Sequence, residues 1–191
     1  INTEITDLNS EISVIIINDA SSQQIIDEYQ NTENINSIEI VNMKENRGHA
    51  RCIASGLKYI YEKKEFDYVI PMDGDGEDRP EEIKNFIQPT EQSNDQSIVG
   101  ERVKRSENLF FKFCYLFHKF LTLVFTGHSI KFGNFTCLTR STVEKMLKEK
   151  STWNSFSGSL KKIEKNLLSI PSIRGTRYFG PSKMSFFNLL K

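Results

Sequence analysis

The chain alternates short, continuous apolar runs with segments whose apolar residues recur every three or four positions. The continuous runs are rich in β-branched residues and end in polar ones, which is typical of buried strands. Such strands are predicted at 11–19, 37–43, 66–72 and 96–102. Helices are predicted between them, at 21–29, at 48–64 and from Pro80 onward. This alternation predicts an α/β domain with a mostly parallel sheet flanked by helices.

Charged and polar side chains follow several of these strands. The third strand is followed by four carboxylates, those of Asp73, Asp75, Glu77 and Asp78. The first strand ends in Asn18 and Asp19, and the fourth ends in Glu101 and Arg102. In open α/β sheets ligands gather at the carboxyl ends of the strands. The acidic turn is therefore expected to be part of a site rather than a solvated loop.

Two familiar uses of such an acidic turn fit this chain poorly. A calcium loop that began at Asp73 would need glycine at its sixth position and glutamate at its twelfth, where this chain has Asp78 and Lys84. A phosphatase of the haloacid dehalogenase type would use Asp73 as its nucleophile. Such enzymes usually carry Thr or Val where this chain has Glu77, and two strands precede the motif here. The phosphatase stays a distant alternative.

The third use is a divalent metal that bridges a nucleotide diphosphate. Mg²⁺ or Mn²⁺ takes a few carboxylate oxygens and leaves other positions for phosphate oxygens and water. Asp73 and Asp75, one residue apart on a turn, can converge on such an ion. The metal would act as a Lewis acid on the leaving diphosphate, and basic residues would bind the phosphates.

The charge balance gives no sign of a nucleic-acid partner. Lys and Arg together number 25, as do Asp and Glu, so no general positive field attracts nucleic acid. Basic residues do concentrate at 102–105 and at 161–183. The three cysteines lie far apart without metal-ligand spacing, and their odd, sparse count fits a reducing compartment. His49, His118 and His128 have no metal-ligand spacing and are expected to be structural or exposed.

A phenylalanine-rich segment, 106–127, predicts an amphipathic helix. Its apolar residues fall at helical spacing, and Lys112, His118 and Lys119 interrupt them. No run of eighteen uninterrupted apolar residues occurs in the chain. An amphipathic helix with lysines beside aromatic residues can lie in a membrane interface, and it can equally be a core helix. The residues leave both possibilities open.

Six segments, in order, resemble the family-two glycosyltransferases with a GT-A fold. Within them the likeness is to the polyprenyl-phosphate glycosyltransferases, of the dolichol-phosphate mannose synthase type. The segments are IIINDASS, NRGHARCIASGL, MDGDGEDRPEEI, VGERVKR, FGNFTCLTRSTVEKML and RGTRYFGPSKMSF. Any one of them is a weak signal, but six in the right order and spacing are strong.

The resemblance implies roles for particular residues. Nucleotide-sugar binding falls to Asp19, Asn46, Gly48 and Asp73, with Asp19 near the base or ribose. Metal binding falls to Asp73, Asp75 and Glu77. Phosphate binding falls to Arg102, Arg105, Ser182 and Lys183. The catalytic set implied is Asp73, Asp75 and Arg102.

The function implied is metal-dependent, inverting transfer of a sugar from a nucleotide-diphosphate sugar to a polyprenyl phosphate, at the cytoplasmic face of the membrane. The phenylalanine-rich helix would then lie along the membrane surface. The segment GNFTC lacks the acid with which some relatives deprotonate a sugar hydroxyl, which modestly favours a phosphate acceptor. A same-fold transferase acting on a sugar hydroxyl of a glycolipid or polysaccharide, and a non-catalytic membrane-associated domain, remain alternatives.

The chain departs from the family pattern in several places. Asn18 and Ala20 stand where the family often has Asp and Gly. The family's first strand would precede Ile1, so residues 1–191 are expected to be one catalytic domain cut at both ends, with any membrane helices after Lys191. Two further expectations concern single residues. Gly48 and Gly56 should permit close helix packing, and Glu81 and Glu82 should be solvated acids in the first turn of a helix.

Overall fold

The computed structural model describes residues 1–22, 29, 32–90, 96–103 and 130–178. The helix predicted at 21–29 and the phenylalanine-rich segment at 106–127 lie largely or wholly outside these residues. Within the described ranges, no helix has both the length and the apolar character needed to cross a bilayer.

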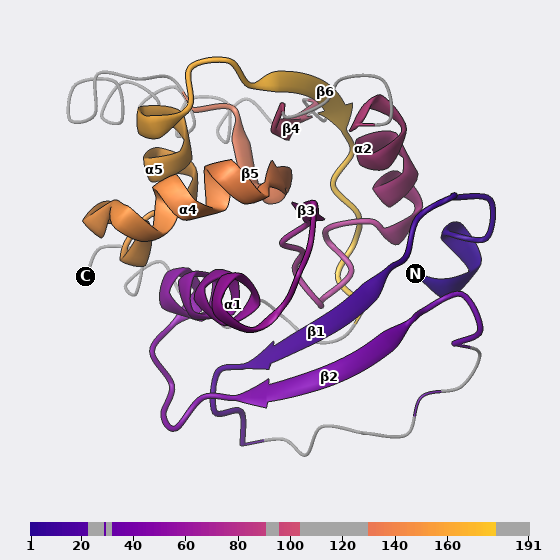
Figure 1. Ribbon diagram of the computed structural model, residues 1–191, viewed down its shortest axis with the longest axis horizontal. Helices are drawn as coiled ribbons and strands as arrows, with labels where there is room; N and C mark the ends of the chain where they lie inside the picture. Colours follow the sequence, from indigo (N-terminus) through magenta and orange to yellow (C-terminus); the bar gives the residue numbers. More distant parts are fainter. Residues whose placement is uncertain (23–28, 30–31, 91–95, 104–129, 179–191) are drawn as a thin grey trace.

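The strands form two separate sheets (Figure 1). A parallel pair consists of β1 (Ser13–Asn18) and β2 (Ser37–Asn42). The other sheet has the order β3-β5-β4-β6, and its strands are β3 (Tyr68–Val69), β5 (Phe132–Thr139), β4 (Ile98–Arg102) and β6 (Leu168–Ser172). In this sheet β5 runs antiparallel to both neighbours, while β4 and β6 are parallel. The predicted α/β class is confirmed, and the four-stranded sheet is mixed because β5 runs antiparallel to its neighbours.

The helices lie against these sheets (Figure 1). The α-helices are α1 (His49–Lys63), α2 (Ile83–Thr90), α4 (Arg140–Lys148) and α5 (Phe156–Ile163). The short 3₁₀ helices are η1 (Asn2–Glu4), η2 (Pro80–Glu82) and η3 (Lys150–Trp153). The predicted starts are close to those observed, because α1 follows Gly48 and Pro80 opens η2, which continues into α2. Side-chain oxygens of Thr139 and Ser155 cap α4 and α5.

The core is centred on β5, which no apolar run in the sequence had marked. Six consecutive residues of this strand, from Asn134 to Thr139, are buried. On one side Leu138 packs with residues of α1, α4 and α5. On the other, Phe135 meets the ring of Phe86 from α2 edge-on, with ring centroids 4.7 Å apart. β5 therefore joins the two halves of the core, and this packing holds the N-terminal end of the strand in place.

The first predicted strand forms, but it is less buried than its sequence indicates. Each residue of the run Val14–Ile17 is only half-buried, although all four are β-branched and apolar. The third strand, predicted at 66–72, pairs only at Tyr68 and Val69. In the described part of the chain β1 and β3 belong to different sheets, so an edge of each has no strand partner.

One expectation about the acidic residues is wrong. Glu82 is not solvated: it is 8 % exposed and accepts hydrogen bonds from Ser172 Oγ (2.6 Å) and the Ile173 amide (2.7 Å). Its neighbour Glu81 is exposed as expected. The difference arises because the Glu82 side chain in η2 is directed toward the end of β6, where the Ser172 hydroxyl and the Ile173 amide donate to it. Glu82 thereby ties the segment after β6 to η2, which follows the acidic turn.

Candidate active site

Asp19, at the end of β1, holds the start of α1. One carboxylate oxygen accepts from the Arg47 amide (2.7 Å) and the other from the Gly48 amide (2.8 Å), while Asn46 Nδ2 donates to the Asp19 carbonyl (2.9 Å). Gly48 has a φ of +84°, a conformation that side chains disfavour, and a Cβ there would meet nothing within 4 Å. Backbone shape rather than close packing explains this glycine. Asp19, Asn46 and Gly48 thus form one interlocked loop.

Gly56 does confirm the expectation of close packing. A Cβ at this position would lie 2.8 Å from Cγ1 of Ile17, so α1 can approach β1 only because the side chain is absent. The close approach also brings Cys52 against β1, where its thiol donates to the Ile17 carbonyl (3.6 Å). Burial, together with the negative charges of Asp19 and Asp73, raises the pKa of this thiol to about 11. Asp19 and Asp73 therefore act on the same side of α1.

The acidic turn is held from within by Asp78. Its carboxylate accepts from the Asp73 amide (2.9 Å) and lies 3.5 Å from Asn134 Nδ2. The same Asn134 amide donates to Asp73 Oδ1 (3.0 Å), while the Asp75 carboxylate accepts from the Glu77 amide (3.0 Å). Asn134 comes from buried β5, so the position of Asp73 is fixed by the core of the protein.

Asp78 is buried, with 9 % of its surface exposed, and this burial changes the pKa of its carboxyl. Burial raises the pKa of this carboxyl to about 6, and the charges of Asp73 and Asp75 contribute to the rise. The hydrogen bond from the Asp73 amide and the positive charge of Arg102 oppose it. Arg102 therefore lies close enough to influence the turn. Its guanidinium covers Gly133, where a Cβ would come within 2.5 Å of Nη2.

The Asp78 shift predicts a pH dependence of stability. Because the folded pKa is raised from 3.8 to about 6, the native state binds the proton more tightly than the unfolded chain. The stability this contributes is complete below about pH 3.8 and is lost as the pH rises through 6, a change on the order of 2–3 kcal/mol. Asp78→Asn, which has no charge to bury, should lack this slope. Urea unfolding of both proteins between pH 4 and 7 tests it, and parallel profiles would contradict it.

A strap of residues after β6, Ile173–Tyr178, lies across the acidic turn. Arg177 Nη2 is 2.9 Å from Asp75 Oδ2 and 3.7 Å from Glu77 Oε2, and Arg174 also pairs with Glu77. The backbone follows the same path, since Gly175 N donates to the Glu77 carbonyl and Tyr178 N to the Asp75 carbonyl, both at 2.8 Å. The two segments are almost a hundred positions apart in the chain.

Glycines allow this close crossing. A Cβ on Gly175 would lie 2.3 Å from the Gly76 carbonyl oxygen. A Cβ on Gly76, whose φ is +90°, would collide with the Tyr178 ring at 2.6 Å. Arg174 and Arg177 were not among the residues predicted for the site. The cluster of basic residues at 161–183 was the signal in the sequence that could have found them.

The chemistry of the turn fits a hard divalent cation. Three carboxylates within five residues, Asp73, Asp75 and Glu77, supply the oxygen ligands that Mg²⁺ and Mn²⁺ prefer. Among the described residues, however, no three His, Cys, Asp or Glu side chains are gathered as a ready metal cluster. Asp75 and Glu77 instead face the two arginines of the strap, and His49 Nδ1 lies 3.8 Å from Asp73 Oδ1. Asp75 and Glu77 therefore already have cationic partners, the two arginines of the strap.

The structure brings together most, but not all, of the residues predicted for the site. Asp73, Asp75 and Glu77 lie on one turn, and the charge of Arg102 acts on it. The loop of Asp19 leads into α1, whose first residue, His49, lies 3.8 Å from Asp73. The remaining predicted phosphate-binding residues, Arg105, Ser182 and Lys183, lie outside the described residues. Both carboxylate oxygens of Asp19 bond to backbone amides, so this residue shapes the loop around Asn46.

The known proteins to which this chain is similar include three relatives, two of which have the same name. The chain is 28% identical over 199 residues to an undecaprenyl-phosphate 4-deoxy-4-formamido-L-arabinose transferase of Photorhabdus laumondii, covering 96% of this chain and 56% of the relative. The protein of the same name from Proteus mirabilis is 27% identical with the same coverage. An uncharacterized protein of Methanocaldococcus jannaschii, MJ0544, is 24% identical over 48% of this chain and 41% of its own length.

The chain spans a little over half the length of the two transferases. The family model described as glycosyl transferase family 2 matches residues 4–156. These residues include the Asp19 loop, the acidic turn and Asn134, while the strap lies beyond them. The chain belongs to glycosyl transferase family 2.

Proposed function

We propose that this protein transfers a sugar from a nucleotide-diphosphate sugar to a polyprenyl phosphate, with inversion and with Mg²⁺ or Mn²⁺, at the cytoplasmic face of the membrane. The observation that carries the proposal is the acidic turn, Asp73–Asp78, fixed by Asn134 and faced by Arg174 and Arg177. Carboxylates for a cation beside cations for a diphosphate are what a nucleotide-diphosphate sugar requires. The names of two relatives, both undecaprenyl-phosphate transferases, support the lipid-phosphate acceptor.

Asp73, Asp75 and Glu77 would hold the metal, which neutralises charge on the leaving diphosphate. The chain's own residues supply the rest. Asn134 donates to Oδ1 of Asp73 and so restrains the orientation of the carboxylate that would bind the metal. Arg177 and Arg174 can exchange Asp75 and Glu77 for phosphate oxygens, because a guanidinium binds both groups with the same geometry.

A polyprenyl-phosphate acceptor needs little catalytic assistance from the protein. A polyprenyl phosphate is already an anion, so its oxygen can attack the anomeric carbon without a general base. The bond from that carbon to the diphosphate breaks as the new bond forms, and the diphosphate carries the electron pair away. Attack from the opposite face inverts the anomeric configuration. Arg102, whose positive charge acts on Asp78, would offset negative charge that develops there.

The experiment uses membranes from cells that express the complete gene. Labelled UDP- and GDP-sugars are supplied with Mg²⁺ or with chelator, and label extracted into organic solvent is counted. Metal-dependent label in a lipid that mild acid cleaves is expected, and it identifies the donor. Label in an acid-stable glycolipid would instead indicate a hydroxyl acceptor. Absence of any transfer, with or without metal, would overturn the enzymatic proposal.

The strap gives a separate prediction. Arg177→Ala removes a guanidinium that makes charge-assisted contacts worth roughly 1.5–3 kcal/mol, so kcat/KM for the donor should fall roughly 10- to 100-fold. Lys145→Ala is the matched control, since Lys145 also pairs with a carboxylate, that of Glu164 at 3.2 Å, but on α4. Steady-state kinetics over a range of donor concentrations measure both. Equal kcat/KM values in the two variants would rule out a role for Arg177.

A further inference from the structure

Glu82 is a buried carboxylate that lies just after the acidic turn. Its Oε2 atom accepts from the Ser172 hydroxyl (2.6 Å), and its Oε1 atom accepts from the Ile173 amide (2.7 Å). A buried glutamate is uncommon unless its oxygens are paired, and here both donors come from one place, the end of β6. Glu82 and Ser172 are 90 positions apart in the chain. The carboxylate is therefore a specific link between two distant segments.

Ser172 is held in place independently of Glu82. It pairs with Arg102 in the parallel β4–β6 ladder, and its carbonyl accepts from the Val103 amide at 3.0 Å. Its side chain is closely packed as well, since a Cβ on Gly100 would lie only 3.0 Å from the Ser172 Cβ. The end of β6 is thus a fixed point of the sheet to which Glu82 is attached.

Three segments that carry charges of the site meet at this link. Glu82 belongs to η2, which follows the acidic turn, and β4 ends in Arg102 beside Ser172. The strap starts at the same point and carries Arg174 and Arg177, which pair with the carboxylates of the turn. The hydrogen bonds of Glu82 therefore determine where the strap leaves the sheet. They also determine how far its guanidinium groups lie from the turn.

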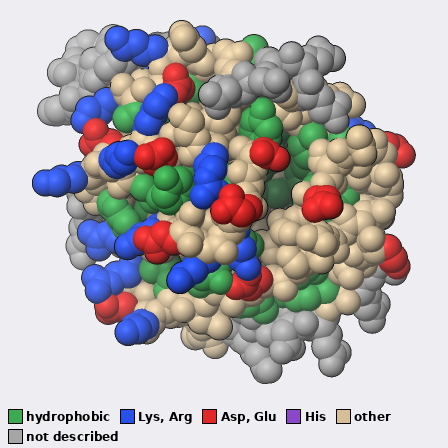
Figure 2. Space-filling model, viewed as in Figure 1, with side chains coloured by type: hydrophobic (Ala, Val, Ile, Leu, Met, Phe, Trp, Pro, Cys, Tyr) green, Lys and Arg blue, Asp and Glu red, His purple; other side chains and the backbone are tan. Residues whose placement is uncertain are grey.

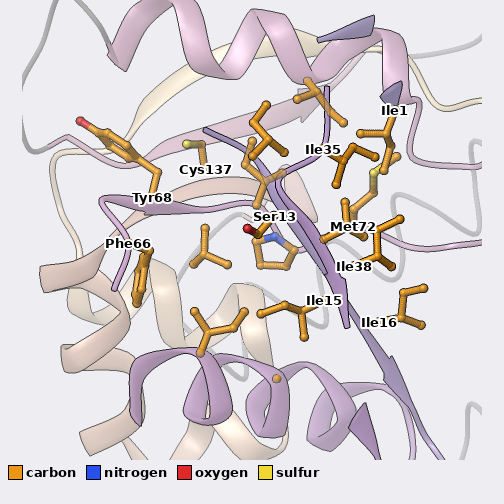
Figure 3. Close-up of a pocket in the computed structure, with 18 of the residues that line it drawn as sticks. Ile1, Ser13, Ile15, Ile16, Ile35, Ile38, Phe66, Tyr68, Met72 and Cys137 are labelled. Atoms are coloured by element: carbon orange, nitrogen blue, oxygen red, sulfur yellow. The ribbon is translucent and has the colours of Figure 1, made fainter. Parts of the chain in front are cut away.

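The acidic turn also borders a large cavity. This cavity has a volume of about 1950 Å³, and residues of the turn and of η2 are in its wall, among them Asp73, Asp78 and Pro80. Figure 3 shows Met72, the residue before the turn, facing the same space as isoleucines of β1 and β2. Figure 2 shows a hollow with a hydrophobic floor on the face seen there. Beside this space the turn is held by Asn134 of β5 and by the strap. What fixes the strap therefore also fixes the turn.

We infer that Glu82 is a positioning residue for the transfer reaction and that it acts through the strap. Its two hydrogen bonds hold the start of the strap at the end of β6, so that Arg174 and Arg177 stay beside the turn where a donor diphosphate would bind. These arginines would bind phosphate in the ground state and in the transition state alike. Loosening the strap should therefore weaken donor binding more than turnover. The inference rests on the proposed role of the strap in donor binding.

The first test measures transfer kinetics of the protein expressed from the complete gene, with labelled UDP- and GDP-sugars as donors. Glu82→Ala should raise KM for the donor roughly tenfold and change kcat less than about threefold. A residue that only stabilised the fold would lower kcat, because less of the enzyme would be active, and would leave KM unchanged. That result would overturn the inference.

Two further variants are matched to this substitution. In Glu82→Gln the side-chain oxygen can accept from the Ile173 amide while the NH₂ group donates to the Ser172 hydroxyl oxygen, so KM should stay within about twofold of wild type. Glu81→Ala removes the adjacent, exposed acid and should also leave KM within about twofold. A tenfold rise in KM in either variant would contradict a role that depends on these two hydrogen bonds.

A double variant tests whether Glu82 acts through Arg177. Both single changes take the same guanidinium away from the donor. The loss of kcat/KM in Glu82→Ala/Arg177→Ala should therefore be well below the product of the two single losses. A loss equal to that product would mean that the two residues act independently, and the inference would be wrong.

Amide hydrogen exchange tests the anchor without any transfer reaction. The amides of Gly175 and Tyr178 donate to carbonyls of the acidic turn, and in Glu82→Ala they should exchange at least about tenfold faster than in wild type. The amide of Ser159 on α5, which donates within its own helix, should not change. Unchanged exchange at Gly175 and Tyr178 would overturn the inference.

Ser172→Ala keeps the measurement possible if Glu82→Ala does not fold. It retains the Cβ that packs against Gly100 and removes only one of the two hydrogen bonds. The amides of Gly175 and Tyr178 should then exchange at least about threefold faster, and rates equal to wild type would count against the anchor. Because exchange needs no transfer activity, failure of the anchor is distinguishable from failure of the proposed function.

Discussion

Asp75→Asn should lower kcat/KM for sugar transfer by about 10³-fold, equivalent to roughly 4 kcal/mol of lost transition-state stabilisation. The asparagine keeps an oxygen to accept from the Glu77 amide, so the turn retains its shape. What disappears is the negative charge that now faces Arg177 at 2.9 Å and that would hold the metal. The measurement is label transferred to lipid by the complete protein at saturating Mg²⁺.

Glu81→Gln is the matched control for this substitution. Glu81 lies on the same stretch of chain and also pairs with an arginine, Arg79, at 3.4 Å, but it is exposed and outside the turn. It should keep activity within about twofold, because exposed pairs contribute little. Activity of Asp75→Asn that matches this control, and that persists in chelator, would show that the carboxylate has no part in catalysis.

Phe86→Ala should reduce the free energy of unfolding by about 3–5 kcal/mol. Phe86 is fully buried, and its ring meets Phe135 edge-on at 4.7 Å. Truncation removes this contact and leaves a cavity beside β5, the strand that also carries Asn134. Urea unfolding at neutral pH, followed by circular dichroism, gives the difference. Activity should fall as well, since Asn134 orients Asp73.

Lys84→Ala, on the same helix, should change the free energy of unfolding by less than about 0.5 kcal/mol, because Lys84 is exposed. Comparing the two variants separates the effect of losing a buried side chain from the effect of alanine on helix propensity. If Phe86→Ala cost no more than Lys84→Ala, the α2–β5 contact would contribute nothing to stability, and the account of the core given above would be wrong.

Local patterns in the sequence were enough to predict the acidic turn and the helix that begins after Gly48. Both depend on neighbours in the chain: carboxylates directly after an apolar run, and apolar residues at helical spacing after a loop. The strand β5 could not be recognised in this way. Its residues, Phe132–Thr139, mix glycine, threonine and asparagine with apolar side chains, and its burial comes from two antiparallel partners distant in sequence.

The site residues that the sequence did not predict were missed for the same reason, because their partners are distant in the chain. Arg177 meets Asp75 across about a hundred residues of chain, and the cluster of basic residues at 161–183 does not indicate which of its members pairs with Asp75. Glu81 and Glu82 are adjacent acids that the sequence does not distinguish. Only Glu82 is buried, and there it accepts a hydrogen bond from Ser172. Asp19 was recognised as a site residue from its place after a strand, but only the fold shows that its carboxylate is used by the amides of Arg47 and Gly48.

The pairing of the strap with the acidic turn has a thermodynamic consequence. Under the proposed mechanism, a metal ion and the arginines compete for the oxygens of Asp75 and Glu77. Metal alone must displace those cations and should bind weakly. A donor diphosphate offers Arg174 and Arg177 new oxygens, and it thereby releases the carboxylates for the metal. Metal and donor would then bind with positive cooperativity, and by linkage each would raise the affinity of the other by the same factor.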